Sequence, residues 1–445
     1  MADLIQKKRH LSSFQSIILG FAALILIGAL LLMLPIASKS RTFTPFNEAL
    51  FTATSAVCVT GLVVHDTASY WSAFGQSIII ILIQIGGLGV VTVAVSFALV
   101  SGRRISLMQR STMQESISAP KVGGIVRLTG FVLKTTLFFE MFGTLVMLPS
   151  FITRFGVKGI WMALFHSVSA FCNAGFDVMG TKTATYVSLT SFADDPVVNM
   201  MLMFLIVIGG IGFLTWDDIF INRHHFKKYR LQSKIILSST AVFILIPALF
   251  FFIFDFSDLT ALKRLLNSLF QSVTTRTAGF NTADISKMTS ASKAIMIVLM
   301  LIGGSPGSTA GGMKTTTVAV LFANAIAGFK RKNDPQLFGR RIEPKAVKNA
   351  ATILMMYFAL FIGGALVISV AEHLPIGTCL FETASAIGTV GLTMGITPQL
   401  GIVSQCVLML LMFFGRVGGL TLIHAAISGT NQNLSKFPQE KVTVG

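Results

Sequence analysis

Eight apolar runs, each about as long as a lipid bilayer is thick, constrain this 445-residue chain more than any other feature. A helix needs about 20 consecutive apolar residues to cross the hydrocarbon core. The runs cover residues 16–36, 73–100, 126–150, 197–216, 233–254, 292–326, 350–371 and 401–426. Only 12% of the residues are charged, whereas a soluble domain carries about 25%. We therefore expect an all-α integral membrane protein with eight transmembrane helices.

The distribution of charge predicts the topology. The formal net charge is +17, which in a soluble protein would suggest a nucleic-acid partner. Here the Lys and Arg residues gather at residues 7–9, 103–110, 223–230 and 330–341, before the first run or after an even-numbered run. All clusters then share one side of the membrane, and basic loops mark the cytoplasmic side. We expect a multi-pass protein of the cell membrane with cytoplasmic N- and C-termini and no nucleic-acid partner.

A shorter, semi-apolar stretch follows every odd-numbered run. These stretches begin near Phe46, Trp161, Leu265 and Thr378. Each is too short to cross the membrane and return as helix, and each ends in a glycine. Non-helical backbone at membrane depth is tolerated only where protein buries it or where it lines a water-filled path. The pattern predicts four re-entrant pore helices within four pseudo-symmetric helix–pore loop–helix repeats around one pore.

This interpretation divides the chain into six parts. They are a cytosolic N-terminus at 1–15, repeats at 16–104, 105–223, 224–332 and 333–430, and a cytosolic C-terminal tail at 431–445.

The four short stretches align with one another from a phenylalanine to a glycine. The aligned pairs are Phe51 and Gly61, Phe165 and Gly175, Phe270 and Gly279, and Phe381 and Gly391. The third copy is one residue shorter than the others. Four copies in the same place between two runs are a strong signal. The alternative, glycines that merely pack helices beside a buried loop, does not predict that placement.

An ion site is the chemistry that such segments favour. A cation entering a narrow pore loses its water shell, and rings of backbone carbonyls can replace it. Presenting consecutive carbonyls requires an extended strand with a glycine free to take unusual dihedrals. The candidate selectivity filter for K+ comprises Val59, Thr60, Gly61, Asn173, Ala174, Gly175, Thr277, Ala278, Gly279, Thr389, Val390 and Gly391.

The even-numbered runs carry glycines of their own. In the second and fourth runs, the simple explanation of close helix packing suffices. The sixth run holds five glycines and a proline within ten residues, which cannot remain helical. We expect a broken helix with a mobile gate below the filter, formed by Gly303, Gly304, Ser305, Pro306, Gly307, Ser308, Thr309, Ala310, Gly311 and Gly312. A static kink is the alternative, and a phosphate-binding loop is set aside because Met313 stands between the glycines and Lys314.

Arg416 lies inside the last run. An arginine facing lipid there costs about 2.5–3.5 kcal/mol, so we expect it to face the pore or a partner group. It would raise an electrostatic barrier to cations or tether the glycine-rich loop, and we assign it to the gate. Snorkelling to the membrane surface is the alternative. The seven histidines show no ligand spacing and no Ser-His-Asp constellation is visible, so we expect no enzyme.

The four glycine strands, together with Thr277 to Phe280 and Gly303 to Gly307, resemble the Trk, Ktr and HKT potassium transporter superfamily. Length, short termini and eight runs are most similar to the bacterial Ktr membrane subunit, KtrB. The resemblance covers about residues 12–430. It implies that Gly61, Gly175, Gly279 and Gly391 are the filter glycines. In plant relatives a serine at the first position accompanies sodium selectivity, so Gly61 suggests potassium.

The resemblance also implies partners. It implies a membrane homodimer on a cytosolic ring of KtrA-type nucleotide-binding subunits of the RCK/KTN kind. ATP, ADP and cyclic di-AMP would act on that ring rather than on this chain, and Na+ would be an activator. The basic loops at 223–230 and 330–341 would be the docking face, although membrane topology explains them equally well.

The leading hypothesis is potassium uptake through a gated selective pore, driven by the membrane potential. The alternative is an alternating-access symporter coupled to sodium or protons, which would be expected to place charged or discontinuous helices at a midplane site. A scaffold without transport is a third hypothesis, but it would not need four filter-like strands.

Overall fold

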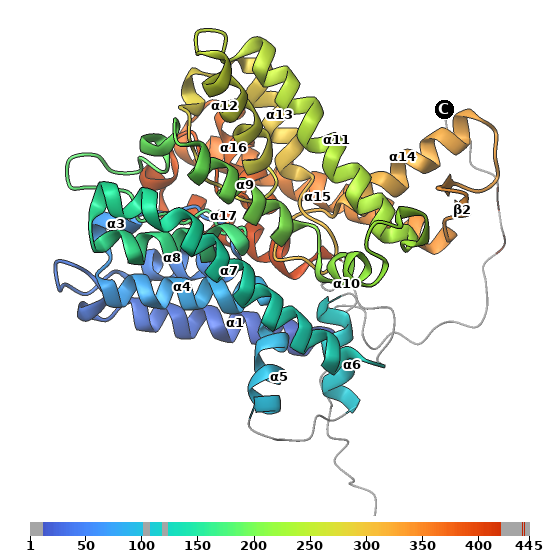
Figure 1. Cartoon of the computed structure of the whole chain (residues 1–445), viewed down its shortest axis with the longest axis horizontal. Helices are drawn as coiled ribbons and strands as arrows, with labels where there is room; N and C mark the ends of the chain where they lie inside the picture. Colours follow the sequence, from blue (N-terminus) through green and yellow to red (C-terminus); the bar gives the residue numbers. More distant parts are fainter. Residues whose placement is uncertain (1–11, 101–106, 118–122, 420–437, 439, 441–445) are drawn as a thin grey trace, which may run out of the picture.

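A computed structural model describes residues 12–100, 107–117, 123–419, 438 and 440. These residues are mostly helical (Figure 1), and they include an antiparallel hairpin of β1 (Gln336–Leu337) and β2 (Arg340–Arg341). Most of the expected C-terminal tail and the last residues of the eighth run, 420–426, lie outside the described residues.

Four helices in the described part of the chain are long and apolar enough to cross a membrane. They are α1 (Ser13–Leu32), α7 (Ile125–Phe155), α11 (Leu231–Phe254) and α15 (Pro344–Glu372). They coincide with the first, third, fifth and seventh apolar runs. Leu30, Leu145, Leu245 and Val370 on these helices are each 60% exposed or more. Apolar surface of this extent is suited to lipid rather than to water.

The even-numbered runs form shorter helices. These are α4 (Ala73–Leu88) and α5 (Val90–Val100), α9 (Pro196–Gly210) and α10 (Phe213–Asn222), α13 (Ser290–Leu301) and α14 (Thr315–Phe329), and α17 (Ile402–Val417). The break between α13 and α14, at residues 302–314, confirms the expected interruption of the sixth run.

Two further breaks correct the sequence-based expectation. The second run divides at Gly89 and the fourth at Gly212, where α10 turns by 97° from α9. Gly89, Gly212 and Gly418, which follows α17, have φ angles of 89°, 91° and 88°. Side chains clash in this region of backbone space, so only glycine enters it readily. These glycines therefore end helices, in addition to the packing role expected for their neighbours.

Four short helices lie inside the molecule. They are α2 (Phe46–Val57), α8 (Lys158–Phe171), α12 (Ala261–Thr274) and α16 (Ile376–Gly388). They begin within four residues of the predicted starts. Each leaves its first turn partly exposed and buries its C-terminal half. The aligned phenylalanines, Phe51, Phe165, Phe270 and Phe381, are all 0% exposed, so each anchors its helix by burying a large apolar side chain.

The short helices pack in a closed arrangement. Each packs against the long helix that precedes it, and α2 also contacts α17 near the other end of the chain. The blue N-terminal and red C-terminal parts of the ribbon consequently lie side by side (Figure 1). This closure brings the four loops that follow the short helices to the centre of the molecule.

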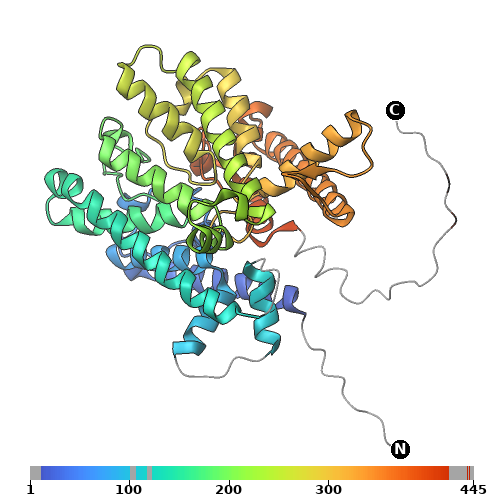
Figure 2. The same cartoon turned by 45° about the vertical axis from the view of Figure 1, so that its right-hand side comes forward.

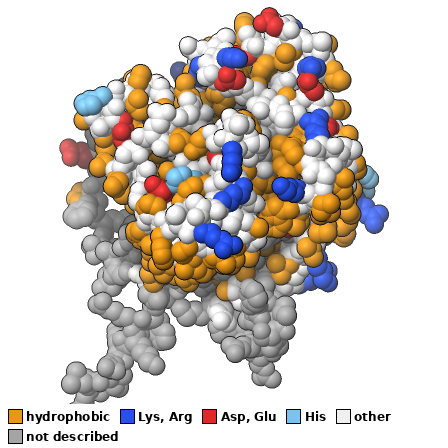
Figure 3. Space-filling view, turned by 90° about the vertical axis from the view of Figure 1, so that its left-hand side faces the viewer, with side chains coloured by type: hydrophobic (Ala, Val, Ile, Leu, Met, Phe, Trp, Pro, Cys, Tyr) orange, Lys and Arg blue, Asp and Glu red, His pale blue; other side chains and the backbone are white. Residues whose placement is uncertain are grey.

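The remaining elements are two helices and five short turns. They are α3 (Thr67–Tyr70), α6 (Leu107–Ile117), and the 3-10 turns η1 (Pro35–Ala37), η2 (Thr190–Phe192), η3 (Phe226–Lys228), η4 (Ile285–Lys287) and η5 (Thr397–Gln399). The C-terminal part of α14 and the hairpin project from the body (Figures 1 and 2). Figure 3 views the end that carries α3, where charged side chains are scattered among white and hydrophobic surface.

Candidate ion pathway

The four aligned segments share one backbone conformation. The residue two before each aligned glycine is left-handed, with φ of 57° at Val59, 57° at Asn173, 64° at Thr277 and 51° at Thr389. The glycines, called the ring glycines below, follow with φ of 94° at Gly61, 68° at Gly175, 80° at Gly279 and 91° at Gly391. Such conformations cost about 1–3 kcal/mol each in non-glycine residues. The surroundings must therefore hold these strands in place.

A side-chain hydroxyl in the last turn of each short helix helps to fix the conformation of the strand that follows. The four residues are Ser55, Ser169, Thr274 and Ser385. In the first and fourth strands the N–H of the ring glycine donates to this hydroxyl, at 3.1 and 3.0 Å. In the second and third strands the hydroxyl donates to the carbonyl that follows the ring glycine, at 2.7 Å in both.

The backbone carbonyl of the same residue also stabilises the strand. It accepts the N–H of the residue before the ring glycine, at 2.8 Å in the first, second and fourth strands and 3.0 Å in the third. Each strand thus directs backbone N–H groups toward its own helix. A sequence signal for this arrangement exists, because a Ser or Thr precedes every ring glycine by five or six residues, but the sequence analysis did not use it.

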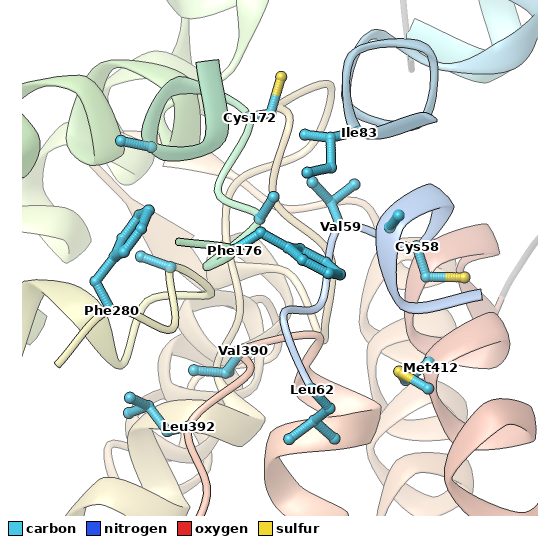
Figure 4. Close-up of a cluster of buried hydrophobic side chains, with 14 of the residues drawn as sticks. Cys58, Val59, Leu62, Ile83, Cys172, Phe176, Phe280, Val390, Leu392 and Met412 are labelled. Atoms are coloured by element: carbon cyan, nitrogen blue, oxygen red, sulfur yellow. The ribbon is translucent and has the colours of Figure 1, made fainter. Parts of the chain in front are cut away.

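The four strands meet in a closed ring. A Cβ added to Gly61 would lie 2.5 Å from the Ala174 carbonyl oxygen of the second strand. A Cβ added to Gly175 would likewise approach the third strand, one added to Gly279 the fourth strand, and one added to Gly391 the first strand. In each case the Cβ would lie within 2.6 Å of the carbonyl oxygen of the residue before the next ring glycine. Figure 4 shows the four loops converging. The residues directly after the ring glycines are labelled there: Leu62, Phe176, Phe280 and Leu392. Any side chain on a ring glycine would strike its neighbour.

The ring offers oxygen atoms without donors. Among the described residues, no donor forms a hydrogen bond to the backbone carbonyl oxygens of the twelve candidate filter residues. The buried hydroxyls of Thr60, Thr277 and Thr389 also lack a partner there. In addition, the four short helices end at the ring, and the C-terminal end of a helix carries partial negative charge. Buried acceptors without donors, near four helix C-termini, fit a cation.

The glycine-rich loop, residues 302–314, lies against the ring. The Thr309 hydroxyl donates to the Asn173 side-chain oxygen at 2.9 Å and lies 3.0 Å from the Phe171 carbonyl oxygen. The Asn173 side-chain N–H2 in turn reaches the Arg276 carbonyl at 3.3 Å. Gly311 meets Thr389, whose Cγ2 would lie 2.9 Å from an added Cβ. The loop thus contacts the second and fourth strands directly.

Other helix breaks hold the same loop. The Ser305 N–H donates to the Gly210 carbonyl at 3.0 Å, and the Phe213 N–H donates to the Gly307 carbonyl at 2.7 Å. The Gly312 N–H donates to the Gly415 carbonyl at 3.1 Å. The loop is therefore tied to α9, α10 and α17, the helices that end or begin at glycines.

Two basic side chains point at carbonyls of this region. Arg416 donates to Thr309 in the loop and to Gly86 and Gly87 at the end of α4. Lys314 donates to the carbonyl of Ala310 at 2.9 Å. Arg416 thus contacts the loop, as the tether hypothesis expected. The Lys314 contact was not among the sequence-based predictions, in which Lys314 appeared only in the rejected phosphate-binding motif.

A cavity of about 200 Å³ adjoins the loop. Gly307, Ser308, Ala310 and Gly312 line it, together with Lys314 and Arg416. None of the twelve candidate filter residues lines it. The loop therefore lines this cavity, which Glu115 also lines, and contacts the second and fourth strands of the ring.

On the opposite side, a carboxylate follows the second strand. Asp177 lies two residues after its ring glycine, and its Oδ1 accepts the Met179 N–H at 3.1 Å. Burial raises the pKa of the Asp177 carboxyl to about 7; the Met179 N–H opposes this shift and the nearby Asp66 adds to it. Asp66 itself accepts the N–H groups of Ser69 and Tyr186. Asp177 was not among the candidate residues predicted from the sequence.

We expect uptake at limiting potassium concentration to fall severalfold between pH 8 and pH 6. Protonating a carboxyl whose pKa is about 7 removes a negative charge that attracts cations to the ring. The Asp177→Asn variant should show low uptake that depends less on pH in this range than uptake by the wild type does. Initial rates of potassium uptake into proteoliposomes measure both effects.

Asp284→Asn is the control for that experiment. Asp284 lies in the loop after the third strand, and its hydrogen bond with Ser286 lowers its pKa. It stays charged throughout the range, so the variant should retain the pH dependence of the wild type. A pH dependence as steep in Asp177→Asn as in the wild type would contradict the assignment.

Comparison with known proteins agrees with this architecture. Residues 5–435 match the family of TrkH cation transport proteins. The chain is 40% identical to the potassium/sodium uptake protein NtpJ of Enterococcus hirae, over 99% of this chain and 100% of that protein. It is 37% identical to the Ktr system potassium uptake protein B of Bacillus subtilis, over 97% and 96% of the two chains. The crystal structure of the potassium transporter TrkH from Vibrio parahaemolyticus has the same fold, with a TM-score of 0.74, 19% identity and coverage of 94% and 85%. The chain belongs to the TrkH family of cation transport proteins.

Proposed function

We propose that this chain takes up potassium ions across the cell membrane through the ring of four strands, driven by the membrane potential. The observation that carries the proposal is the closed ring of glycines with acceptor oxygens that no described donor bonds. The names of two relatives, a potassium/sodium uptake protein and a potassium uptake protein, support potassium as a transported ion.

The proposed architecture has eight transmembrane segments and four re-entrant helices. Each odd-numbered apolar run forms one crossing, and each even-numbered run forms another despite its glycine break. The short helices α2, α8, α12 and α16 enter from the outside and return as the strands. Four repeats at 16–104, 105–223, 224–332 and 333–430 follow from this division, with residues 1–15 and 431–445 in the cytosol. The equivalent backbone angles of the four strands support the repeat.

The filter would work by substitution of ligands. A dehydrated cation in the ring would exchange water for carbonyl oxygens of residues 59–61, 173–175, 277–279 and 389–391. Hydrogen bonds from the strand N–H groups to the short helices direct those N–H groups away from the ring. The strands carry no charged side chain, so selectivity would depend on the carbonyls and on the spacing that the glycines set.

The gate would be the loop between α13 and α14. It contacts the ring and lines a cavity, and Arg416 and Lys314 add positive charge beside it. Cations would meet both a steric and an electrostatic barrier there. Opening requires the hydrogen bonds of the loop to Asn173, to Gly210 and to Arg416 to be broken.

Replacing Thr309 by Val is expected to raise potassium flux about five- to tenfold. The substitution removes the hydroxyl that reaches Asn173 and Phe171, and a typical hydrogen bond contributes about 1 kcal/mol. The hold on the closed loop therefore weakens while the volume of the side chain is kept. Flux into proteoliposomes at fixed protein density measures the change.

Thr316→Val provides the matched control. Its hydroxyl, in the first turn of α14, makes no hydrogen bond within the described part of the chain. Flux should stay at the wild-type rate in this variant. Equal rates for Thr309→Val and wild type, in folded protein, would show that Thr309 does not hold the gate.

The rival proposal is a symporter that couples sodium or protons to potassium. Such carriers place charged residues and helix breaks around a midplane site. Helix breaks occur here, but the charged side chains that contact the loop near the ring, Arg416 and Lys314, are both cationic. These favour a barrier to cations rather than a second cation site.

Reconstitution into liposomes discriminates the two. A pore gives a current that reverses at the potassium equilibrium potential, whatever the sodium or proton gradient. A symporter gives a reversal that moves with both gradients. The same measurement under bi-ionic conditions gives the permeability of sodium relative to potassium, which matters because NtpJ carries both ions in its name.

We propose that the chain works as a homodimer on a cytosolic ring of KtrA-type nucleotide-binding subunits. ATP, ADP and cyclic di-AMP would act on that ring, and Na+ would stimulate transport. The name of the Ktr relative and the basic segments at 223–230 and 330–341 support the docking face. Light scattering of the purified protein should give the mass of a dimer, and a monomer mass would contradict it.

A further inference from the structure

A basic pocket and an apolar groove adjoin on the outside of α7, away from the ring. The pocket, of about 420 Å³, lies between the beginning of α7 and α10, and its basic residues are Arg127 and Arg230. The groove, of about 390 Å³, continues along α7 between α9 and α10. Phe131 and Phe220 line both spaces, so the pocket and the groove are adjacent, one with polar lining and the other mostly apolar.

The bend at Gly212 creates this site. Because α10 turns 97° from α9, its outer face meets α7 instead of extending the fourth run. Phe220 packs edge-on against Phe131, with ring centroids 5.9 Å apart. Even so, Phe220 and Ile221 remain 77% and 66% exposed. Large apolar side chains on a helix beside basic residues are typical of a helix that lies in the membrane interface.

The charges of the site are positive and incompletely paired. Arg127 and Lys134 are exposed on α7, seven residues apart and so on the same face. Within the described residues neither has a hydrogen bond or an ion pair. Arg230 pairs with Asp217 at 3.2 Å. The Asp218 carboxylate also accepts the backbone N–H of Arg230 at 2.8 Å. Three cations and two carboxylates still leave a net positive charge around the pocket and the groove.

The position of Lys134 shows which kind of anion fits. It lines a groove whose other residues are mostly apolar, including Phe138, Phe139 and Trp216. A lysine at such a depth keeps its aliphatic carbons among apolar groups and extends its ammonium group toward the phosphates at the membrane surface. Arg127 stands about 10 Å away along the helix, at the level of the basic pocket. A ligand that satisfies both needs an anionic head and a long apolar chain.

We propose that an anionic phospholipid of the cytoplasmic leaflet occupies this site. Its phosphate lies between Arg127 and Arg230, with Lys134 extended to it from below, and an acyl chain fills the groove along α7, α9 and α10. Basic pockets between helices on the cytoplasmic side are a common way to bind anionic headgroups. A soluble phosphate compound would leave the groove empty, and a zwitterionic lipid would leave the positive charge unbalanced.

The site also adjoins the loop proposed as the gate. Phe213, the first residue of α10, donates its N–H to Gly307, so a lipid that holds α10 also restrains the loop. This consequence for flux rests on the proposed function. Binding of the lipid does not, and the two are tested separately.

Native mass spectrometry of the purified protein tests binding, with phosphatidylglycerol and phosphatidylcholine as probes. Wild type should retain phosphatidylglycerol over phosphatidylcholine. The double variant Arg127→Gln, Lys134→Met should lose about 30-fold in affinity for phosphatidylglycerol, because each basic residue near an anionic headgroup contributes about fivefold. Both residues are exposed, so the fold should be unaffected, as size-exclusion profiles would verify.

The control is the double variant Lys345→Gln, Lys348→Gln, which removes two exposed charges from the beginning of α15. It should retain phosphatidylglycerol like the wild type. Equal retention of the two lipids by wild type, or equal losses in both double variants, would overturn the site and indicate non-specific attraction. Flux in liposomes with and without phosphatidylglycerol, measured on the same proteins, then reports on the coupling to the loop alone.

Discussion

Replacing Gly61 by Ser is expected to reduce potassium-over-sodium selectivity by about tenfold or more. A Cβ at this position would lie 2.5 Å from the Ala174 carbonyl oxygen, and φ of 94° is unfavourable for any side chain. The ring must deform to accept the serine, at a cost of about 1–2 kcal/mol. A change of 1.4 kcal/mol in the relative binding of two ions is tenfold. Bi-ionic reversal potentials of the reconstituted protein measure the ratio.

Gly377→Ser is the matched control for this variant. Gly377 lies at the beginning of the short helix of the fourth repeat, and an added Cβ there meets nothing within 4 Å. Its selectivity should equal that of the wild type. If Gly61→Ser transports with the wild-type permeability ratio, the first strand does not set selectivity and the filter assignment is wrong.

Removing Pro306 to Thr309 is expected to raise potassium flux about tenfold or more. The N–H of Gly304 lies 3.2 Å from the carbonyl oxygen of Gly311. Because the two sides of the loop are already adjacent, a peptide bond between Ser305 and Ala310 can close the chain after the deletion. The deletion also removes Thr309, which contacts Asn173 and Arg416, and therefore the obstruction below the ring. Stopped-flow uptake into proteoliposomes measures the rate.

Loss of fold is the confounding result, and a second deletion guards against it. Removing Lys182 and Thr183 from an exposed outer loop shortens the chain far from the proposed gate, and flux should not change. Both proteins should elute as the wild type does in size-exclusion chromatography. An unchanged or lower flux in well-folded protein without residues 306–309 would show that the loop is not an obstruction.

Much of the site could be predicted from the sequence because its signals are local. Hydropathy alone indicates lipid as the solvent, and the recurrence of Phe and Gly at nine or ten residues locates the four strands. The density of glycines between 303 and 312 excludes a helix there without any reference to neighbours. Those inferences need only intrinsic properties of short segments.

Helix breaks at Gly89 and Gly212 could not be predicted in the same way. A helix that contains glycines can either continue and pack closely against a neighbour or break at one of them. Which of the two occurs depends on the surrounding residues. Gly86 and Gly209 stay helical and let the backbones of Val57 and Phe171 approach closely, whereas Gly89 and Gly212 take a positive φ. The bend that forms the proposed lipid site therefore had no signature in the sequence.

What the sequence by itself determined is the kind of solvent, the repeat and the residues of the four strands, since hydropathy and glycine spacing act over a few residues. Only the tertiary structure decided that each ring glycine abuts the carbonyl of the next strand, and that the fourth strand closes on the first. It also decided that Asn173, Arg416 and Lys314 point at the glycine-rich loop. These contacts join residues more than a hundred positions apart in several cases, and their partners are mostly backbone carbonyls. Every residue carries such a carbonyl, so the identity of the amino acids cannot reveal which one is used.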